Sequence, residues 1–454
     1  MNSNSQGKNS QVEGKKWFQL MESKNTMTWI AMIFIVIVAT MVSSMENSWY
    51  NTYVYDNVTP NPQPVAWMVS ISAITAALSA IVFGAASDRH RGRWGRRRPF
   101  ILFGFLLAGA LTIVFAFTDR IESIKLAIPL IVIIDSVMMI GFGAAYDGSF
   151  GGYVTDITNK NNRGRVQSII SIVTGVGGIL TSVIAGITID NLGYSFFFTC
   201  MGVLMIVAGV IGGLILQDKP VPEQPEDANR KSLIAEILGN FSLESIKKNK
   251  DLFLLLLAVT IWGSGWYAVV IYQLIYVMQY LGFSATDAGL ASAITAVVGL
   301  FFALPIGALS DRFGRKKISV ISLIIMIGGA IIYSLLKPGS SFIELVIFQM
   351  ILMLPLTGFG VCGNAWAKDL YPKNKTAQFS GLALIFIVTI PMIIGSSLGS
   401  FVIQKFGTPV VVGGEAGTIP SPALFYLAAA ATVLCIIPIL FISEKHKANE
   451  EVTE

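Results

Sequence analysis

Long apolar runs recur along the whole chain, and they constrain its fold more than any other feature. Each is about 20 residues or longer, which is the length that an α-helix needs to cross a hydrocarbon layer. About twelve of them lie between Trp29 and Ile442. Charged residues make up only 13% of the chain, against about 25% in an ordinary soluble domain. The sequence therefore predicts an all-α membrane protein with twelve transmembrane helices.

Basic residues gather in every second connection between the apolar runs. These connections are Arg89–Arg98, Lys160–Arg165, Lys219–Lys250, Arg312–Lys317, Lys368–Lys375 and Lys445–Lys447. Because positively charged loops stay on the cytoplasmic side of a membrane, we expect these connections and both termini in the cytoplasm, in a multi-pass protein of the cell membrane. The net charge of +5 then reflects topology, and no nucleic-acid partner is expected.

One loop motif occurs twice, once in each half of the chain. Gly84–Pro99 has a Gly-x-x-x-Asp-Arg step followed by Gly-Arg and further basic residues, and Gly307–Lys317 is a shorter copy. Asp156 and Asp369 begin a second pair of matching turns, at the ends of the fourth and tenth runs. Such matching halves are typical of internally duplicated transporters, which bind their substrate near the middle of the membrane and expose it to each side in turn.

The duplication predicts two six-helix bundles joined by a cytoplasmic linker. The expected segments are an N-terminal tail over 1–27, a bundle over 28–217, a linker over 218–251, a bundle over 252–443 and a C-terminal tail over 444–454. The linker is rich in proline at first and then amphipathic over Ser232–Lys248. We expect a tether, although its second part also has the pattern of a helix on a membrane surface.

The two copies of the loop motif carry a resemblance to a known family. Gly307–Lys317 matches without a gap the loop between the second and third helices of each half in the major facilitator superfamily. The first copy contains the insertion His90–Trp94, followed by an Arg-Pro-Phe step at 98–100. This longer form resembles the sucrose/proton symporters of plants and their animal relatives, and less closely the glycoside-pentoside-hexuronide cation symporters. The resemblance implies the major facilitator fold and proton-coupled symport of a sugar or glycoside, and we expect a monomer in the lipid bilayer.

Charged residues of the repeated loops are candidates for gating. They are Asp88, Arg89, Arg96 and Asp156 in the first half, and Asp311, Arg312, Arg315 and Asp369 in the second. A carboxylate at the end of one helix and a guanidinium on a neighbouring turn form charge-assisted bonds, which are able to latch the cytoplasmic side shut. The alternative is that the arginine cluster only sets the topology.

Glu46 in the first apolar run is a candidate for substrate binding. At helical spacing it shares a face with Trp49, Tyr50 and Tyr53. A carboxylate beside aromatic rings suits sugar recognition, because hydroxyls bond to the carboxylate while the apolar face of the sugar stacks on a ring. The alternative is an aromatic belt at the membrane interface with a solvated glutamate. The resemblance favours the binding role, because the animal relatives carry a glutamate at the matching position.

Asp147 and Asp135 in the fourth run are the other carboxylates within the apolar runs. Asp147 falls where those animal relatives have an Asp-Gly pair. Since removal from water favours the neutral form of a carboxyl group, we expect Asp147 to couple transport to protons and to contact substrate, with Glu46 sharing the coupling role. The alternative for Asp147 is a structural carboxylate bonded to backbone amides or hydroxyls. Asp135 precedes it by twelve residues, about 120° around the helix, so it is expected to face elsewhere and to pack.

The second half supplies further candidate substrate contacts. Trp262, Trp266 and Gln273 share a face of the seventh run, and Asn364 lies late in the tenth. The resemblance implies that these helices line the cavity, so the four side chains are candidates for binding a sugar. Aromatic residues in transmembrane helices also serve as packing residues or interfacial anchors, and that alternative stays open.

Several classes of function are excluded or disfavoured. The only histidines, His90 and His446, lie in the predicted cytoplasmic segments, so no histidine-based triad or metal site is expected and the chain is not predicted to be an enzyme. No cofactor is expected beyond a proton as coupling ion. Melibiose-type permeases have sodium-binding carboxylates where Ala76 and Ala80 stand here, which disfavours sodium. The alternatives are a uniporter or exporter of another small organic solute, and a non-transporting membrane sensor.

Overall fold

Twelve helices in the described part of the chain are long and apolar enough to cross a membrane, which confirms the predicted all-α membrane fold. The computed structural model describes residues 23–158, 162–217, 247, 249–372, 379, 382–412 and 415–443. The predicted C-terminal tail lies outside these residues, as do most of the predicted N-terminal tail and linker, including nearly all of the amphipathic segment Ser232–Lys248.

The first half contains six spans, of which the first and fourth each change helix type along their length. Its elements are α2 (Ser23–Ser44), η1 (Met45–Trp49), α3 (Tyr50–Asn57), α4 (Pro62–Arg89), α5 (Arg98–Phe115), η2 (Thr118–Arg120), α6 (Ile124–Phe142), η3 (Gly143–Phe150), α7 (Gly151–Ile157), α8 (Arg163–Leu192) and α9 (Tyr194–Ile215). The segments η1 and η3 are π-helical, and such segments occur often at functional sites.

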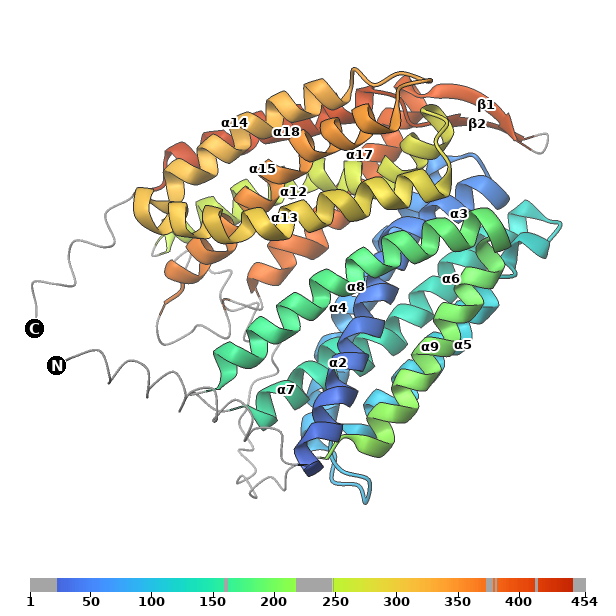
Figure 1. Cartoon of the computed structure of the whole chain (residues 1–454), viewed down its shortest axis with the longest axis vertical. Helices are drawn as coiled ribbons and strands as arrows, with labels where there is room; N and C mark the ends of the chain where they lie inside the picture. The colour runs from blue at the N-terminus through green and yellow to red at the C-terminus, as the bar shows by residue number, and fades with distance from the viewer. Residues whose placement is uncertain are drawn as a thin grey trace, which may run out of the picture.

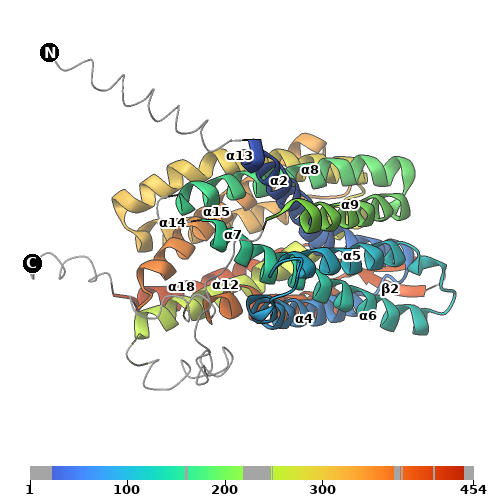
Figure 2. The ribbon, with the colours of Figure 1, turned by 90° about the horizontal axis from the view of Figure 1, so that it is seen from below.

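The second half repeats this order and adds a two-stranded hairpin before its last helix. Its elements are α12 (Lys250–Ile275), η4 (Tyr276–Tyr280), α13 (Ala285–Phe313), α14 (Arg315–Tyr333), α15 (Phe342–Asp369), η6 (Ile385–Thr389), α17 (Ile390–Phe406), β1 (Thr408–Val412), β2 (Glu415–Ile419) and α18 (Ala423–Leu440). The strands are antiparallel, with Thr408 opposite Ile419. Figures 1 and 2 show the hairpin at one end of the bundle.

Local sequence signals set several helix starts. Ser341 and Glu344 form a capping box at the start of α15, in which each side chain accepts a hydrogen bond from the backbone amide of the other. Asn61 accepts from the Gln63 amide at the start of α4, where Pro62 is the first helical residue. These two helices therefore begin where a capping residue satisfies a free amide of the first turn.

Large apolar side chains cover much of the outer surface of the bundle. Leu304 is 81% exposed and Phe301 is 74% exposed, and Leu214 is similarly open. A soluble protein rarely leaves so many large apolar side chains uncovered, whereas lipid chains would cover them. The exposed apolar surface therefore agrees with a position in the bilayer.

The two halves are joined by hydrogen bonds at one end of the molecule, which we call the hairpin end because it carries β1 and β2. The Asn51 amide donates to the Ile271 carbonyl at 3.3 Å and the Tyr272 hydroxyl donates to the Pro62 carbonyl at 3.1 Å. The backbone amide of Thr418 in the hairpin donates to the Pro60 carbonyl at 3.0 Å. The ribbons of the two halves lie together here and diverge towards the basic end, which carries the repeated loops (Figure 1).

Two carboxylates of the first half make contacts with the second half at the hairpin end, Asp56 with the Gln279 side-chain amide and Asp190 with two backbone amides. Asp190 makes the contact with a helix start. It lies near the end of α8, and its carboxylate accepts from the backbone amides of Ala285 at 3.1 Å and Thr286 at 2.7 Å, at the start of α13. A carboxylate at a helix N-terminus satisfies free amides and interacts favourably with the helix dipole. The hydrogen bonds seen between the two halves in the described residues all lie between the middle of the bundle and this end.

Candidate functional site

A cavity of about 610 Å³ lies between the two halves. The first half contributes α2, η1 and α8 to its wall, and the second half contributes α12, η4, α13 and α15. Its volume is within the range of about 300–1,000 Å³ that is usual for small-molecule sites. Its position matches the predicted binding site between the halves.

The cavity wall is rich in hydroxyl and amide groups. The hydroxyl side chains are those of Thr40, Ser43, Ser44, Ser48, Ser182, Ser292, Thr295 and Thr357, and the amide side chains are those of Asn47, Gln273 and Gln349. Two indole rings, Trp49 and Trp266, come from opposite halves. None of the described residues that line the cavity carries a charge, so the site suits a polar but uncharged molecule.

Two of the cavity amides are oriented by neighbouring side chains. The Gln273 amide donates to the Tyr333 hydroxyl at 3.4 Å, and the Gln349 amide donates to the Ser292 hydroxyl at 3.4 Å. In each case the carbonyl oxygen of the amide remains able to accept a hydrogen bond. The second half therefore presents oriented amide groups to the cavity.

The predicted aromatic face of the first span divides between two environments. Trp49 lines the cavity, but Tyr50 and Tyr53 are fully buried in the core of the first half. The Tyr50 ring stacks on Phe115 with centroids 3.9 Å apart, and both tyrosines contact Phe198 edge-on. The expectation that Tyr50 and Tyr53 would face the substrate is therefore corrected, because aromatic packing within the first half holds them away from the cavity.

Of the candidates in the second half, Trp266 and Gln273 line the cavity and the other two do not. The Trp262 indole donates to the Met326 sulfur at 3.4 Å and packs against Phe359, with ring centroids 4.8 Å apart. Asn364 is exposed, one turn before the basic end of α15, and is not part of the cavity wall. Trp262 is thus placed as a packing residue, which is the alternative left open by the sequence.

Glu46 lies behind the cavity wall, inside the first half. It is 2% exposed, and its Oε1 accepts a hydrogen bond from the Ser72 hydroxyl of α4 at 3.2 Å. Asp135 of α6 is fully buried and close enough to Glu46 for the two carboxyl groups to interact electrostatically. Asp135 is buried whereas Asp147 is exposed, and the expectation that Asp135 only packs is corrected, because its carboxyl group interacts with that of Glu46.

Asp147 has a different environment from the other two carboxylates. It lies in η3, where its side chain is exposed, and no described residue forms a hydrogen bond or ion pair with it. The next residue, Gly148, packs closely against the backbone of Ala80 and Gly84 in α4. Asp147 is therefore held at the surface of the first half by close helix packing, and it is not among the residues that line the cavity.

Ion pairs at the basic end lie within the first half. The Arg97 guanidinium bonds the Asp88 carboxylate at 2.6 Å and the Asp156 carboxylate at 2.7 Å. Arg96 bonds the same two residues, at 3.3 Å and 2.9 Å. Arg97 was not among the sequence-based candidates, because it was one of several adjacent arginines and nothing in the sequence indicates which of them is buried.

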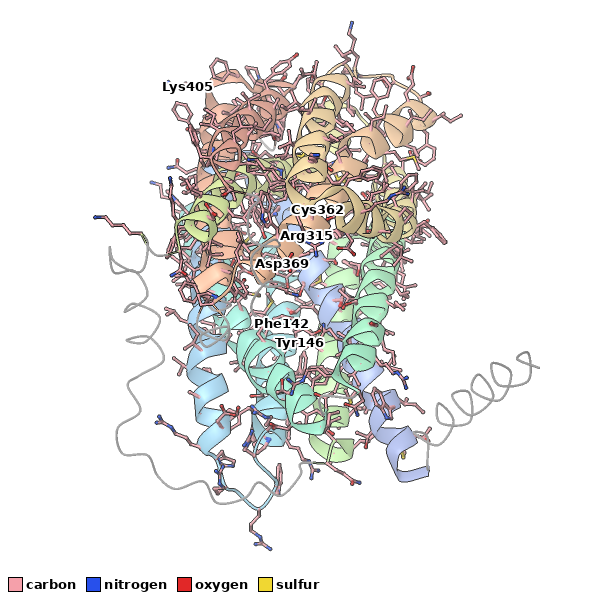
Figure 3. All side chains as sticks on the ribbon, turned by 90° about the vertical axis from the view of Figure 1, so that its left-hand side faces the viewer. Phe142, Tyr146, Arg315, Cys362, Asp369 and Lys405 are labelled. Atoms are coloured by element: carbon pink, nitrogen blue, oxygen red, sulfur yellow. The ribbon has the colours of Figure 1, made fainter. Side chains whose placement is uncertain are left out.

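The second half repeats this arrangement with fewer charges. Arg315 bonds Asp311 at 2.9 Å and Asp369 at 2.8 Å, and Figure 3 shows Arg315 and Asp369 together on that half, apart from Phe142 and Tyr146 of the first half. The Arg312 guanidinium lies over the Phe313 ring. Among the described residues, neither Arg312 nor Arg89 takes part in an ion pair, and every ion pair lies within one half.

Comparison with known proteins identifies the family. The family model described as Major Facilitator Superfamily matches residues 28–278 and 263–454. The chain belongs to the major facilitator superfamily. It is therefore a membrane transporter and not an enzyme, as the sequence predicted.

Relatives of this transporter handle chemically different solutes. An uncharacterised transporter of the same superfamily from Bacillus subtilis is 23% identical over 346 residues, which is 75% of this chain and 78% of the relative. A citrate-proton symporter from Klebsiella pneumoniae is 26% identical over 292 residues, which is 60% of this chain and 61% of the relative. The solved structure of the nucleoside transporter NupG has a TM-score of 0.69 and 14% identity, covering 91% of this chain and 98% of that chain.

Most of the polar residues in the transporter's cavity were missed by the sequence analysis. Serine and threonine are common in transmembrane helices because their hydroxyls bond the backbone one turn earlier, as Thr40 does to Val36 and Ser43 does to Ala39. Their presence alone therefore gives no signal of a binding site. The recurrence of Thr40, Ser43 and Asn47 on one helical face is the signal that was available.

Proposed function

We propose that this transporter carries an uncharged sugar or glycoside together with a proton, by alternating access. The uncharged, hydroxyl-rich cavity with an indole ring from each half is the observation that carries the substrate class. Sugar hydroxyls exchange hydrogen bonds with serine, threonine and amide groups, and the apolar face of a sugar packs on an aromatic ring. An anionic solute would lie in this cavity without a cationic partner, which is costly away from water.

The hydrogen bonds between the halves support one stage of the transport cycle. By the positive-inside rule the basic end faces the cytoplasm, so the bonded hairpin end faces outwards. The described conformation is then closed to the outside. Because the ion pairs of Arg97 and Arg315 lie within single halves, they favour movement of each half as one body about the cavity.

Proton coupling is supported by carboxylates that form no ion pair with any residue in the described part of the chain. Glu46 and Asp147, which the sequence analysis singled out, both belong to the first half, and the structure adds Asp135. The loop insertion His90–Trp94 supports the sucrose-type assignment, and a relative named as a citrate-proton symporter supports protons as the coupling ion. The surrounding bilayer is the expected environment, with the chain working as a monomer.

Uptake by purified protein in proteoliposomes tests this function. With an inward proton gradient, we expect accumulation of at least one uncharged mono- or disaccharide from a panel, accompanied by acidification of the lumen. Citrate and a nucleoside serve as solutes of the classes handled by relatives. Accumulation of citrate without any sugar would contradict the proposed substrate, and sugar entry without proton movement would identify a uniporter instead.

Trp266→Ala tests the cavity as the sugar site. Loss of a ring contact worth about 1.5 kcal/mol should raise the substrate concentration for half-maximal uptake by about tenfold. Trp262→Ala is the matched control, because Trp262 belongs to the same helix but contacts Met326 and Phe359 instead of the cavity. Equal effects of the two variants would remove Trp266 from the binding site.

A further inference from the structure

The Glu46 carboxylate is enclosed by three elements of the first half. It extends from η1 towards α4, where the Ser72 hydroxyl donates to it, and towards α6, which carries Asp135. Among the described residues, Ser72 is the one seen to donate a hydrogen bond to this carboxylate. The carboxylate therefore lies in a small polar site within an otherwise apolar bundle.

Asp135 lacks even that hydrogen bond. Its side chain is fully buried, and neither of its carboxylate oxygens has a hydrogen-bond partner among the described residues. A buried ionised carboxylate without a partner is among the costliest groups in a protein interior. Its position beside Glu46 requires an explanation other than packing, because an apolar residue would pack there at lower cost.

Among the described residues, no cationic side chain forms an ion pair with Glu46 or Asp135. The titratable groups that face this pair from the neighbouring elements are the hydroxyls of Tyr50 in α3 and Tyr267 in α12. Of the cationic side chains in the described residues, only Arg97 is buried. It pairs with Asp88 and Asp156 at the basic end instead of with Glu46 or Asp135. Two adjacent carboxylates away from water disfavour each other's charge, so the pair holds a proton more tightly than either carboxylate would alone.

We propose that Glu46 and Asp135 together form the proton-binding site of this transporter, with one dissociable proton shared between the two carboxyl groups. On loading, an O–H bond of a hydronium ion breaks, an O–H bond forms to a carboxylate oxygen of the pair, and a water molecule is left. On release this O–H bond breaks and a water molecule on the other side of the membrane accepts the proton as hydronium. This inference rests on the proposed proton-coupled transport and names the site that carries the proton.

The pair is linked to the substrate cavity through η1. The segment Met45–Trp49 is π-helical, and the Tyr50 amide donates to the Met45 carbonyl five residues earlier. Within this one wide turn, Asn47 and Trp49 reach the cavity while Glu46 reaches Ser72. A solute bound against Trp49 therefore acts on the helical turn that holds the proton-binding carboxylate.

The second half also reaches the pair, since Tyr267 of α12 lies near Glu46. Movement of one half against the other changes the distance between this hydroxyl and the carboxylate. The environment of the shared proton thus differs between the two ends of the transport cycle. Such a difference is required if proton binding is to be linked to alternating access.

Infrared difference spectroscopy of the purified full-length protein in lipid tests the site without any transported solute. A pH titration should show the C=O stretching band of a protonated carboxylic acid near neutral pH. We expect complete loss or a clear shift of this band in both Glu46→Gln and Asp135→Asn, and its retention in Asp147→Asn. A band unchanged in both variants of the pair, or lost only in Asp147→Asn, overturns the proposal.

A second measurement tests whether the carboxylate pair binds sodium instead of a proton. Exchange of potassium for sodium at constant pH and ionic strength should leave the band of the wild-type protein unchanged. Loss of the band in sodium would show that the carboxylates hold a metal ion and would overturn the proposal. The band is measured without a sugar, so failure of this titration is distinguishable from failure of the proposed substrate.

Conservative variants separate a proton site from a structural role. Glu46→Asp and Asp135→Glu keep a carboxyl group at each position and should retain the band, even if they fold less well than the wild type. In proteoliposomes, Glu46→Gln should lose proton uptake but keep solute exchange in the absence of a gradient. Loss of the band in the conservative variants, with normal size-exclusion behaviour, would contradict a shared proton.

Discussion

Arg97 is the residue at which the repeated loop becomes part of the folded core. Arg97 is 5% exposed. Its guanidinium donates hydrogen bonds to Ser87 and Asp88 of α4 and to Asp156 of α7. Planar, multiply bonded guanidinium groups are suited to such sites. The basic loop, whose composition suggests only topology, thus also ties three helices of the first half together.

Arg97→Ala should destabilise the first half. Removal of one partner from a buried ion pair costs about 3–5 kcal/mol, because it leaves a carboxylate without compensation, although Arg96 still bonds Asp156 here. We therefore expect the lower part of this range and a clear fall in the thermal midpoint of the purified protein. Arg91→Ala is the control, since Arg91 is exposed and bonds only nearby backbone carbonyls. A similar midpoint for both variants would contradict a structural role for Arg97.

At the scale of single residues, the sequence predicted which carboxylates lie in the membrane but not which ones meet. Glu46 and Asp135 are 89 positions apart, and their proximity depends on how η1 and α6 pack around Ser72 of α4. The wrong prediction that Tyr50 and Tyr53 face the substrate has a related cause. The prediction used a regular helical period, and that period does not hold through the π-helical turn at η1.

Among the helices, α8 and α13 make the closest contact between the two halves. Gly289 of α13 faces the backbone carbonyl of Ser182 in α8, and Gly186 of α8 faces that of Ala285. A methyl group at either glycine would overlap with the opposing carbonyl. These glycines therefore allow the two helices to meet at the hairpin end.

Gly289→Ala should open that contact. The added methyl separates α13 from α8 and disfavours the conformation closed at the hairpin end. A cysteine introduced at Ser43 in the cavity, in a chain whose native cysteines are replaced, should then react at least about tenfold faster with an impermeant thiol reagent added outside, equivalent to about 1.4 kcal/mol. Gly328→Ala is the control, because nothing lies within 4 Å of the added methyl there. An unchanged rate in Gly289→Ala would show that the helices do not separate.

The whole molecule consists of two rigid halves that are joined only weakly, by the contacts between them at the hairpin end, which we call the junction. Ion pairs hold the helices within each half, whereas the described junction consists mainly of hydrogen bonds between neutral groups. Each such bond is worth about 1 kcal/mol net. A junction of this kind holds one conformation without preventing the other, which is what alternating access requires.

Asp190→Ala should shift this balance towards the conformation open at the hairpin end. Loss of a carboxylate that caps a helix N-terminus costs about 0.5–2 kcal/mol, and here that cost falls on the conformation closed at the hairpin end. The population of the conformation open at this end should therefore rise about fivefold. Distances between spin labels placed on the two halves at this end would measure it. Asp287→Ala, in the first turn of the same helix, is the control, because the Asp287 carboxylate makes no described contact with the first half. No change for Asp190→Ala would exclude it from the junction.

The number of helices and their division into two halves were predictable because apolar length and repeated loops are properties of the sequence alone. The conformation was not, since the same residues must support closure at either end. The hydroxyl groups of the cavity, such as Ser182 and Thr295, were also not identifiable. Residues of these types occur throughout the spans, and only the meeting of helices from both halves makes them a site.

With the orientation proposed above, the β1–β2 hairpin offers a way to control the protein from outside the cell. It belongs to the second half, yet its Thr418 amide bonds Pro60 of the first half and its Gly417 packs against the same residue. An antibody fragment that recognises the hairpin and the Pro60 turn as one epitope would bind only while the two are in contact. Such a reagent would arrest the cycle without competing for the cavity, and its binding would report the conformation of the transporter on intact cells.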